Sequence, residues 1–402
     1  MATDLIVVGG GISGLSLAWK AAGAGKKVLV LERERRVGGC LHSHRLGGGF
    51  WFEMGAHTTY NSYVSFLDVV AGTGLSGHVV ARGPARARFG FVRDGKYSWL
   101  SPPKVLLKLN WLEAAIHLPA GLRHGKEGET IASYYSRLVG PRNFARVLSP
   151  FFSTVPSQDA DGFPVEGPGS LFKKRPRRQD FPRSFAIQGG VQSVCEAAAS
   201  APGVTVETGV GAVRVARNAS GFAVTTTDGR TLEAPLAAVA APADVAAGLL
   251  SETHPELAAA ISKVKTVQVE SLGTVLPRER CWMPECAFVV HAGDVPFSIV
   301  TRDTVPDPQR RAFAFHFRPG VARHEKLRRI IDVLRVGRED LQLLVEQTRT
   351  LPAPALGHGA VVQEIDGCLA GGKLAVTGNY FAGLSIEDCV GRSFAEWARV
   401  AG

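Results

Sequence analysis

Three glycines near the N-terminus have the spacing of a phosphate-binding turn. Gly9, Gly11 and Gly14 form G-x-G-x-x-G directly after a short apolar run, and the residues that follow predict a helix. The first glycine permits a tight turn, the second lets the backbone approach a pyrophosphate, and the third lets the helix pack on the strand. The start of a helix also directs free N–H groups at phosphate oxygens. Ile12 and Ser13 lie at that start, and we predict that both contact the cofactor.

An acidic residue completes this motif. Glu32 lies eighteen residues after Gly14, at the end of a second apolar run. An acid at this place accepts hydrogen bonds from ribose hydroxyls and repels a 2′-phosphate, which disfavours NADP. Strand, helix and strand in about thirty residues form one βαβ unit. This context favours a dinucleotide site over a glycine-rich turn without a ligand, and we include Arg33, next to Glu32, in that site.

The chain after this unit resembles the flavin-containing amine oxidase superfamily. Gly38 and Gly39 match the turn that lies over the FAD pyrophosphate in that superfamily. Most members have Arg or Lys after the two glycines, to meet the pyrophosphate charge, and this chain has Cys40. Some branches, including porphyrinogen oxidases, also lack the basic residue. The resemblance implies FAD as the cofactor.

A second matching segment would pass under the flavin. Gly55, Ala56 and His57 correspond to it. A histidine near a redox centre can move protons, which makes His57 a candidate catalytic group, but we favour the alternative, a hydrogen-bonded structural histidine. We identify no other acid or base for the reaction.

The segment 377–389 narrows the resemblance to one branch. It reads T-G-N-Y-F-A-G-L-S-I-E-D-C and is similar to the G-N-Y-x-x-G-[VL]-S-x-x-D-C signature of protoporphyrinogen and coproporphyrinogen oxidases. A strand, a turn and a helix start in this order could aim backbone N–H groups at the flavin, where negative charge gathers on reduction. The implied FAD contacts are Gly378, Asn379, Leu384 and Ser385.

Two stretches in the middle of the chain agree with that branch. Residues 185–192 resemble its F-x-x-G-G-[LVM]-Q segment, and Val213 matches the position whose backbone meets the adenine. Arg88, with Arg86 as the second choice, matches an arginine that faces a propionate of the tetrapyrrole. A guanidinium binds a carboxylate as a fork, whereas the alternative for both residues is a solvated arginine on a strand.

The elements that must position these residues predict an α/β fold. A Rossmann-type, glutathione-reductase-like FAD-binding domain would carry an inserted mixed-sheet substrate domain and a small helical domain, with the pocket between the first two. The predicted boundaries are 1–81, 184–260 and 352–402 for the FAD domain, 82–100 and 261–351 for the substrate domain, and 101–183 for the helical insert at the membrane or the substrate mouth. Within them we predict an amphipathic helix over 102–116 and a charged helix over 323–344.

Composition limits the function classes. The 402 residues are 45% apolar and 20% charged, which excludes global disorder, and 46 Lys and Arg exceed 36 Asp and Glu. This balance suits a carboxylated substrate or a lipid surface, and no nucleic-acid motif accompanies it. The six cysteines are scattered, so no metal is predicted. With no leader and no long apolar run, we expect a cytoplasmic protein. The basic run 173–178 is interpreted first as solvated surface, and peripheral membrane contact together with 104–122 is the alternative.

The predicted function is FAD-dependent oxidation of a porphyrinogen, protoporphyrinogen IX or coproporphyrinogen III, with oxygen as the acceptor. Another oxidoreductase of the superfamily is an alternative: an amine oxidase needs an aromatic pair, and Asn379-Tyr380 supplies at most one member. A polyene desaturase needs an apolar tunnel, which a buried Arg88 would contradict. A flavoprotein isomerase without net redox, or a member that has lost catalysis, also remains open.

Overall fold

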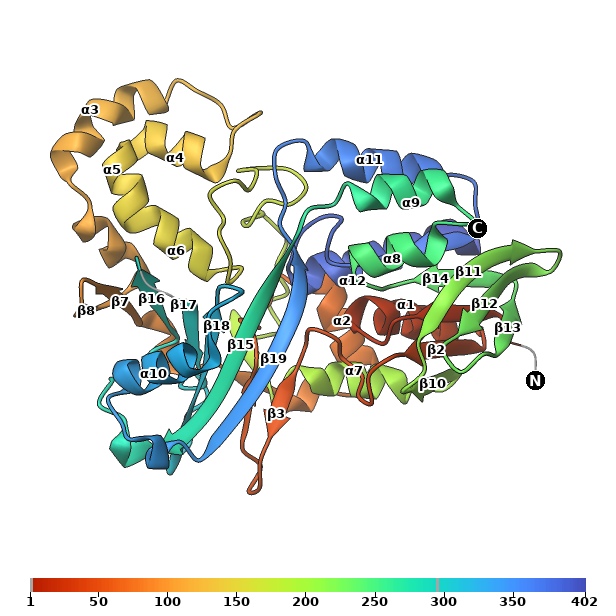
Figure 1. The fold of residues 1–402 in the computed structure, drawn as a ribbon, viewed down its shortest axis with the longest axis horizontal. Coiled ribbons are helices and arrows are strands. Elements are labelled where there is room, and N and C mark those ends of the chain that lie inside the picture. Colours follow the sequence, from red (N-terminus) through yellow and green to blue (C-terminus); the bar gives the residue numbers. More distant parts are fainter. Residues whose placement is uncertain (1–2, 294–295) are drawn as a thin grey trace.

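A parallel sheet of five strands carries the glycine motif. The computed structural model describes residues 3–293 and 296–402. The strand order is β10-β2-β1-β14-β20 (Figure 1). The strands are β1 (Leu5–Val8), β2 (Val28–Glu32), β10 (Val204–Thr208), β14 (Leu236–Val239) and β20 (Leu374–Val376). Each neighbouring pair is parallel, as apolar strands covered on both faces require.

Helices cover both faces of this sheet, because successive side chains of a strand point to opposite sides. Leu5 and Val7 enter one core, and Ile6 and Val8 enter the other. The first core includes α1 (Ile12–Gly23), α2 (Val64–Gly72), α7 (Gln192–Ala199) and α12 (Ile386–Ala401). The second includes α8 (Ala243–Leu250), α9 (Pro255–Ser262), α11 (His358–Leu369) and the small sheet of β11 (Ala212–Asn218), β12 (Gly221–Thr226) and β13 (Thr231–Ala234). The predicted α/β class is confirmed.

A second sheet has seven strands in the order β19-β15-β18-β17-β16-β7-β8 (Figure 1). Its strands are β7 (Phe89–Arg93), β8 (Lys96–Leu100), β15 (Thr266–Pro277), β16 (Phe288–Ala292), β17 (Pro296–Thr301), β18 (Arg310–Phe317) and β19 (Leu343–Pro352). All neighbours are antiparallel except β7 and β16. Helix α10 (Arg323–Leu334) packs against one face.

Short strands fill the connections. They are β3 (Ser43–Arg45) with β4 (Trp51–Glu53), and β9 (Ser184–Ile187) between β5 (Thr59–Tyr60) and β6 (Val79–Ala81). Beyond them, the helices of the segment 101–183 all fall within residues 102–154 and lie to one side of the second sheet (Figure 1), whereas residues 155–183 form turns and irregular chain. The helices are α3 (Trp111–Gly121), α4 (Ile131–Val139), α5 (Pro141–Asn143) and α6 (Ser149–Thr154). The division into three domains at the boundaries given above remains a prediction.

Two helix predictions were wrong in extent. The charged helix ends at Leu334, where Arg335 adopts a left-handed conformation with φ 53°, and residues 343–352 form β19 instead. Strand β19 pairs with β15 along its length, so a long-range pairing overrides the local charge pattern. Residues 102–108 form a short 3₁₀ turn, and the α-helix starts only after Asn110, whose side chain accepts hydrogen bonds from Leu112 and Glu113 N–H groups.

Candidate active site

The turn between β1 and α1 needs glycine for two different reasons. A Cβ on Gly9, whose φ is +112°, would lie 2.4 Å from the Ala240 carbonyl oxygen, and one on Gly14 would lie 1.9 Å from the Gly9 oxygen. A Cβ on Gly11 would meet nothing nearer than the Gly39 Cα at 3.9 Å. Packing therefore demands Gly9 and Gly14, whereas Gly11 keeps space open before the N-terminus of α1. Among the described residues, no side chain caps that N-terminus.

Glu32 links the turn that follows β2 to the glycine turn between β1 and α1. Its buried carboxylate accepts hydrogen bonds from the Gly10 N–H at 2.7 Å and the Glu34 N–H at 2.8 Å. Each carboxylate oxygen can accept a further bond, so the predicted contact with a ribose hydroxyl stays possible.

The Gly38-Gly39 turn lies against the glycine motif. The Gly38 N–H donates to the Gly10 carbonyl at 2.8 Å, and Gly38 bridges to Gly11. Arg36 supports the turn from its own side, because its guanidinium donates to the Gly39 carbonyl at 2.8 Å. The two turns thus form adjacent walls of one channel.

These walls enclose a cavity of about 530 Å³, within the usual size range of ligand pockets. Its far side belongs to the second sheet, through Ser271 of β15, His316 of β18, and Gln347 and Arg349 of β19. The predicted cofactor residues that line it are Gly9, Gly11, Ile12, Ser13, Glu32, Arg33, Gly38, Gly39, Gly55, Ala56, His57, Gly378, Asn379 and Leu384.

Three predicted cofactor residues do not line the cavity. Gly14 packs behind the turn, as described above. The Val213 side chain is 53% exposed, and the neighbouring Gly211 and Ala212 line the cavity in its place. The Ser385 hydroxyl caps α12, accepting a hydrogen bond from the Asp388 N–H at 3.1 Å. These residues shape the cavity from outside it.

The predicted substrate arginines do not reach the cavity either. Arg86 and Arg88 are exposed and line neither described pocket. The Arg86 guanidinium turns back on its own 3₁₀ turn and donates to the carbonyls of Arg82 and Gly83. Arg88 lies directly before the aromatic strand β7, as expected, but its side chain is exposed, so its contact with the substrate stays a prediction.

Two histidines on the cavity wall are held uncharged. His57 Nε2 lies 3.0 Å from the Cys40 carbonyl oxygen, and burial lowers its pKa to about 4. His316 Nδ1 lies 2.9 Å from the Ser271 hydroxyl, and burial lowers its pKa to about 3. Both imidazoles are therefore neutral at pH 7, and His57, the predicted catalytic group, is a weak base there.

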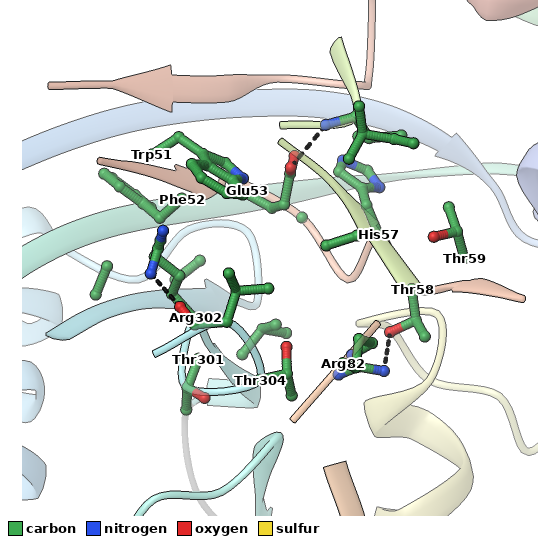
Figure 2. A pocket seen from close by; sticks show the side chains of 18 of the residues that line it. Trp51, Phe52, Glu53, His57, Thr58, Thr59, Arg82, Thr301, Arg302 and Thr304 are labelled. Carbon is green, nitrogen blue, oxygen red and sulfur yellow. Dashed lines mark hydrogen bonds between the residues drawn. The ribbon is translucent and has the colours of Figure 1, made fainter. Parts of the chain in front are cut away.

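A smaller cavity of about 60 Å³ shares Gly55 and His57 with the larger one (Figure 2). Arg82 and Arg302 line it, and burial lowers the pKa of Arg302 to about 10. The Arg302 guanidinium lies 4.4 Å from the ring centre of Trp51. Since a water molecule occupies about 30 Å³, this space suits a group of carboxylate size.

Glu53 forms another side of the smaller cavity (Figure 2). Its carboxylate accepts hydrogen bonds from the Val191 N–H and the Ser43 hydroxyl, both at 2.9 Å, while burial raises its pKa to about 7. Glu53 is the acid that opens the segment expected under the flavin, but the sequence analysis gave it no role. It missed Arg82 and Arg302, which lie in no motif; Arg302 directly follows strand β17 and precedes Asp303.

Fold and site together define a dinucleotide-binding α/β protein whose cofactor cavity faces a second sheet. The chain belongs to the family of flavin containing amine oxidoreductases, whose model matches residues 12–305. The glycine turns, the uncapped N-terminus of α1 and Glu32 fit FAD, and Gly11 leaves the room that its diphosphate needs. FAD as the cofactor and the oxidoreductase class are therefore confirmed.

Curated relatives give a narrower similarity. The chain is 25% identical to protoporphyrinogen oxidase 1, chloroplastic, of Arabidopsis thaliana over 323 residues, covering 69% of this chain and 59% of that protein. It is 36% identical to coproporphyrinogen III oxidase of Propionibacterium freudenreichii subsp. freudenreichii over 92 residues, covering 23% of this chain and 17% of that protein. The chain thus covers less than two thirds of the length of either relative.

Solved structures share the whole fold. A candidate protoporphyrinogen oxidase from Exiguobacterium sp. 255-15 superposes with a TM-score of 0.79 at 16% identity, covering 99% of this chain and 98% of that one. At this identity the likeness shows the fold alone.

Proposed function

We propose that this chain oxidises a porphyrinogen to a porphyrin in haem biosynthesis, with protoporphyrinogen IX or coproporphyrinogen III as the substrate. One observation carries the proposal: the cavity wall opposite the glycine turns bears the uncharged groups Ser271, His316 and Gln347. A large macrocycle could lie between this wall and the cofactor. The similarity to a protoporphyrinogen oxidase over 69% of the chain supports the same substrate class.

The residues of the wall limit how protons can move. Each round of oxidation removes a hydride from a methylene bridge and a proton from a pyrrole N–H. The chemistry that FAD would supply, when held by the glycine turns and Glu32, is acceptance of the hydride, with oxygen as the final electron acceptor and peroxide as its product. Because His57 and His316 are neutral with lowered pKa values, we expect the pyrrole proton to leave to water. His57 then positions the segment 55–57 through its contact with Cys40.

The smaller cavity can receive a substrate carboxylate. Arg82 and Arg302 line it, and the Arg302 Nε is buried without a hydrogen-bond partner among the described residues. An unpaired buried donor costs about 1–3 kcal/mol, which a bound carboxylate would recover. We assign to these two arginines the role that the sequence analysis gave to Arg86 and Arg88.

Porphyrin fluorescence tests the reaction. Aerobic, FAD-loaded protein would be mixed with protoporphyrinogen IX or with coproporphyrinogen III, against autoxidation without enzyme. We expect fluorescence to rise faster than the control with one of the two. No excess rate with either, from protein with a bound-flavin spectrum, would overturn the proposal.

The carboxylate contact is tested with a neutral substrate. We expect Arg302→Gln to raise KM for the porphyrinogen acid about tenfold, which corresponds to about 1.4 kcal/mol, and to leave KM for its methyl ester unchanged. Arg280→Gln, at an exposed arginine of the short 3₁₀ turn that follows β15, is the matched control. Equal changes for acid and ester would remove Arg302 from substrate binding.

A polyene oxidoreductase is the second candidate, because Arg88 is exposed and no longer argues against an apolar substrate. The cavity also contains Val155, Val269 and Leu351. An absorbance shift of a polyene, without porphyrin formation, would favour this candidate. The amine oxidase alternative loses support, since the buried Tyr380 stacks on Phe381 and does not line the cavity.

We extend the proposal to a lipid surface at the helical segment. Within the described residues, no helix has the length and apolar character to cross a bilayer. Helix α3 nevertheless exposes Leu112 by 80% and Ile116 by 76%. The predicted basic run 173–178 offers less free positive charge to a lipid surface than expected, because Lys173 and Arg175 both pair with Asp388.

Vesicle sedimentation tests this extension. We expect the protein to sediment with vesicles that contain anionic lipid, and Leu112→Glu with Ile116→Glu to abolish sedimentation without changing the flavin spectrum. Equal sedimentation of variant and wild type would contradict it.

A further inference from the structure

Arg349 brings a positive charge to the cofactor cavity from a distant part of the chain. It belongs to β19, in the second sheet, yet it lines the cavity together with Gly38, Gly39 and Cys40. Its guanidinium donates two hydrogen bonds to Glu34, the one from Nη2 being 3.2 Å long. The ion pair is only partly exposed, with 21% of the Arg349 side chain and 32% of the Glu34 side chain accessible.

The ion pair does not satisfy the whole guanidinium. A guanidinium has five N–H donors, and Glu34 occupies one on each terminal nitrogen. Arg349 Nε is buried and has no hydrogen-bond partner among the described residues. A buried donor without an acceptor is costly, so this N–H indicates an acceptor supplied by a ligand of the cavity.

The other side chains near the Gly38-Gly39 turn bring little positive charge to the cavity. Cys40 stands where a basic side chain would meet a diphosphate, and burial raises the pKa of its thiol, so Cys40 is neutral at pH 7. Arg36 donates to the backbone carbonyls of its own turn and does not line the cavity. Arg33 lines the cavity but is exposed, where water screens its charge.

We propose that Arg349 binds the diphosphate of FAD and replaces the basic residue that Cys40 does not provide. Glu34 holds the guanidinium in place, and Nε–H remains for a phosphate oxygen, a charge-assisted bond of the strong kind. A strand of the second sheet thereby becomes part of the cofactor site. This inference rests on FAD binding and not on the choice of porphyrinogen.

Two variants that nearly preserve side-chain size test the proposed contact between Arg349 and the FAD diphosphate. Glu34→Gln leaves Arg349 charged, whereas the double variant Glu34→Gln/Arg349→Gln removes both charges without leaving either one unpaired. We expect Glu34→Gln to bind FAD at least as tightly as wild type, and the double variant to bind it at least tenfold more weakly. The Kd is measured on protein stripped of flavin, by quenching of flavin fluorescence. Arg323→Gln, which removes an exposed arginine paired with Glu346 of β19, is the control and should bind like wild type.

Two further measurements decide whether the phosphate is the partner. The double variant should lose no affinity for riboflavin, which has no phosphate, and adding Cys40→Arg to it should recover most of the lost FAD affinity. Equal FAD affinity of the single and double variants would overturn the proposal. Equal losses for riboflavin and FAD, or no recovery with Cys40→Arg, would also overturn it, because Arg349 would then act on the shape of the cavity.

Discussion

The two cavities that meet at His57 are built in different ways. The larger one is formed mainly by backbone turns, with glycines where a Cβ would collide or fill the channel. The smaller one is formed by the side chains of Glu53, Arg82 and Arg302, which come from separate parts of the chain. The first depends on local spacing and the second on tertiary packing. Substitutions in the larger cavity should therefore act through steric collisions with the backbone, and substitutions in the smaller cavity through changes of charge.

The largest effect should come from the backbone of the larger cavity. Gly14→Ala places a Cβ 1.9 Å from the Gly9 oxygen, and we expect it to reduce the free energy of unfolding by about 3 kcal/mol and to release FAD. Gly23→Ala, in the same helix but with no described atom within 4 Å of its Cβ, should be neutral or slightly stabilising. Urea unfolding measures both. Equal stability of the two variants would refute the collision.

The two neutral histidines that line the larger cavity, His316 and His57, should make the fold sensitive to acid. His316 has a pKa of about 3 in the folded state, below its value of 6.5 in the unfolded chain. The unfolded state binds more protons below pH 6.5, so stability falls as the pH drops from 6.5 toward 3, by about 1.4 kcal/mol per unit. His57 acts in the same direction down to about pH 4.

Measurements of the unfolding free energy between pH 7 and pH 4 test whether stability falls as the pH drops. We expect His316→Gln to reduce the slope of unfolding free energy against pH, and His324→Gln, at an exposed position, to leave it unchanged. A slope that is the same in His316→Gln and wild type would contradict the assignment.

Glu53 in the smaller cavity should respond in the opposite direction. Its pKa is about 7 in the folded state and 4.5 in the unfolded chain, so stability is lost as the pH rises from 4.5 through 7. Glu53→Gln keeps the hydrogen bonds of the neutral form, and we expect it to be more stable than wild type at pH 8 by about 2 kcal/mol. Thermal unfolding at pH 5 and pH 8 measures the difference, which should be much smaller at pH 5.

The smallest effect should come from the stacked arginine. Arg302 lies over both Phe50 and Trp51, and we expect Arg302→Leu to lower stability by about 1 kcal/mol. Arg280→Leu, at an exposed side chain, should change it by less than about 0.5 kcal/mol. Equal stabilities of the two variants would show that the stacking contributes nothing measurable.

Local spacing explains what could be predicted from the sequence. The turn at Gly9, the acid at Glu32 and the start of α12 at Ser385 lie within single segments, and the structure has each element where it was expected. The hairpin at Asp94-Gly95 was predictable for the same reason, since both residues take positive φ.

The rest depends on contacts between distant segments. Strand β19 is recognisable only through its pairing with β15, so Arg349 could not be assigned to the cofactor cavity. A resemblance to a family places Arg88 along the chain, before β7, but does not determine its exposure. The smaller cavity combines segments more than two hundred residues apart, and no local pattern encodes that meeting.

The contact between α1 and α12 has a consequence for synthesis of the protein. The Ser393 hydroxyl donates to the Ser13 carbonyl at 2.8 Å, and the two helices pack in one core. A ribosome makes the glycine motif first and α12 hundreds of residues later. The newly made motif therefore lacks the helix that supports it, and we expect FAD to bind stably only after α12 has been translated and has docked.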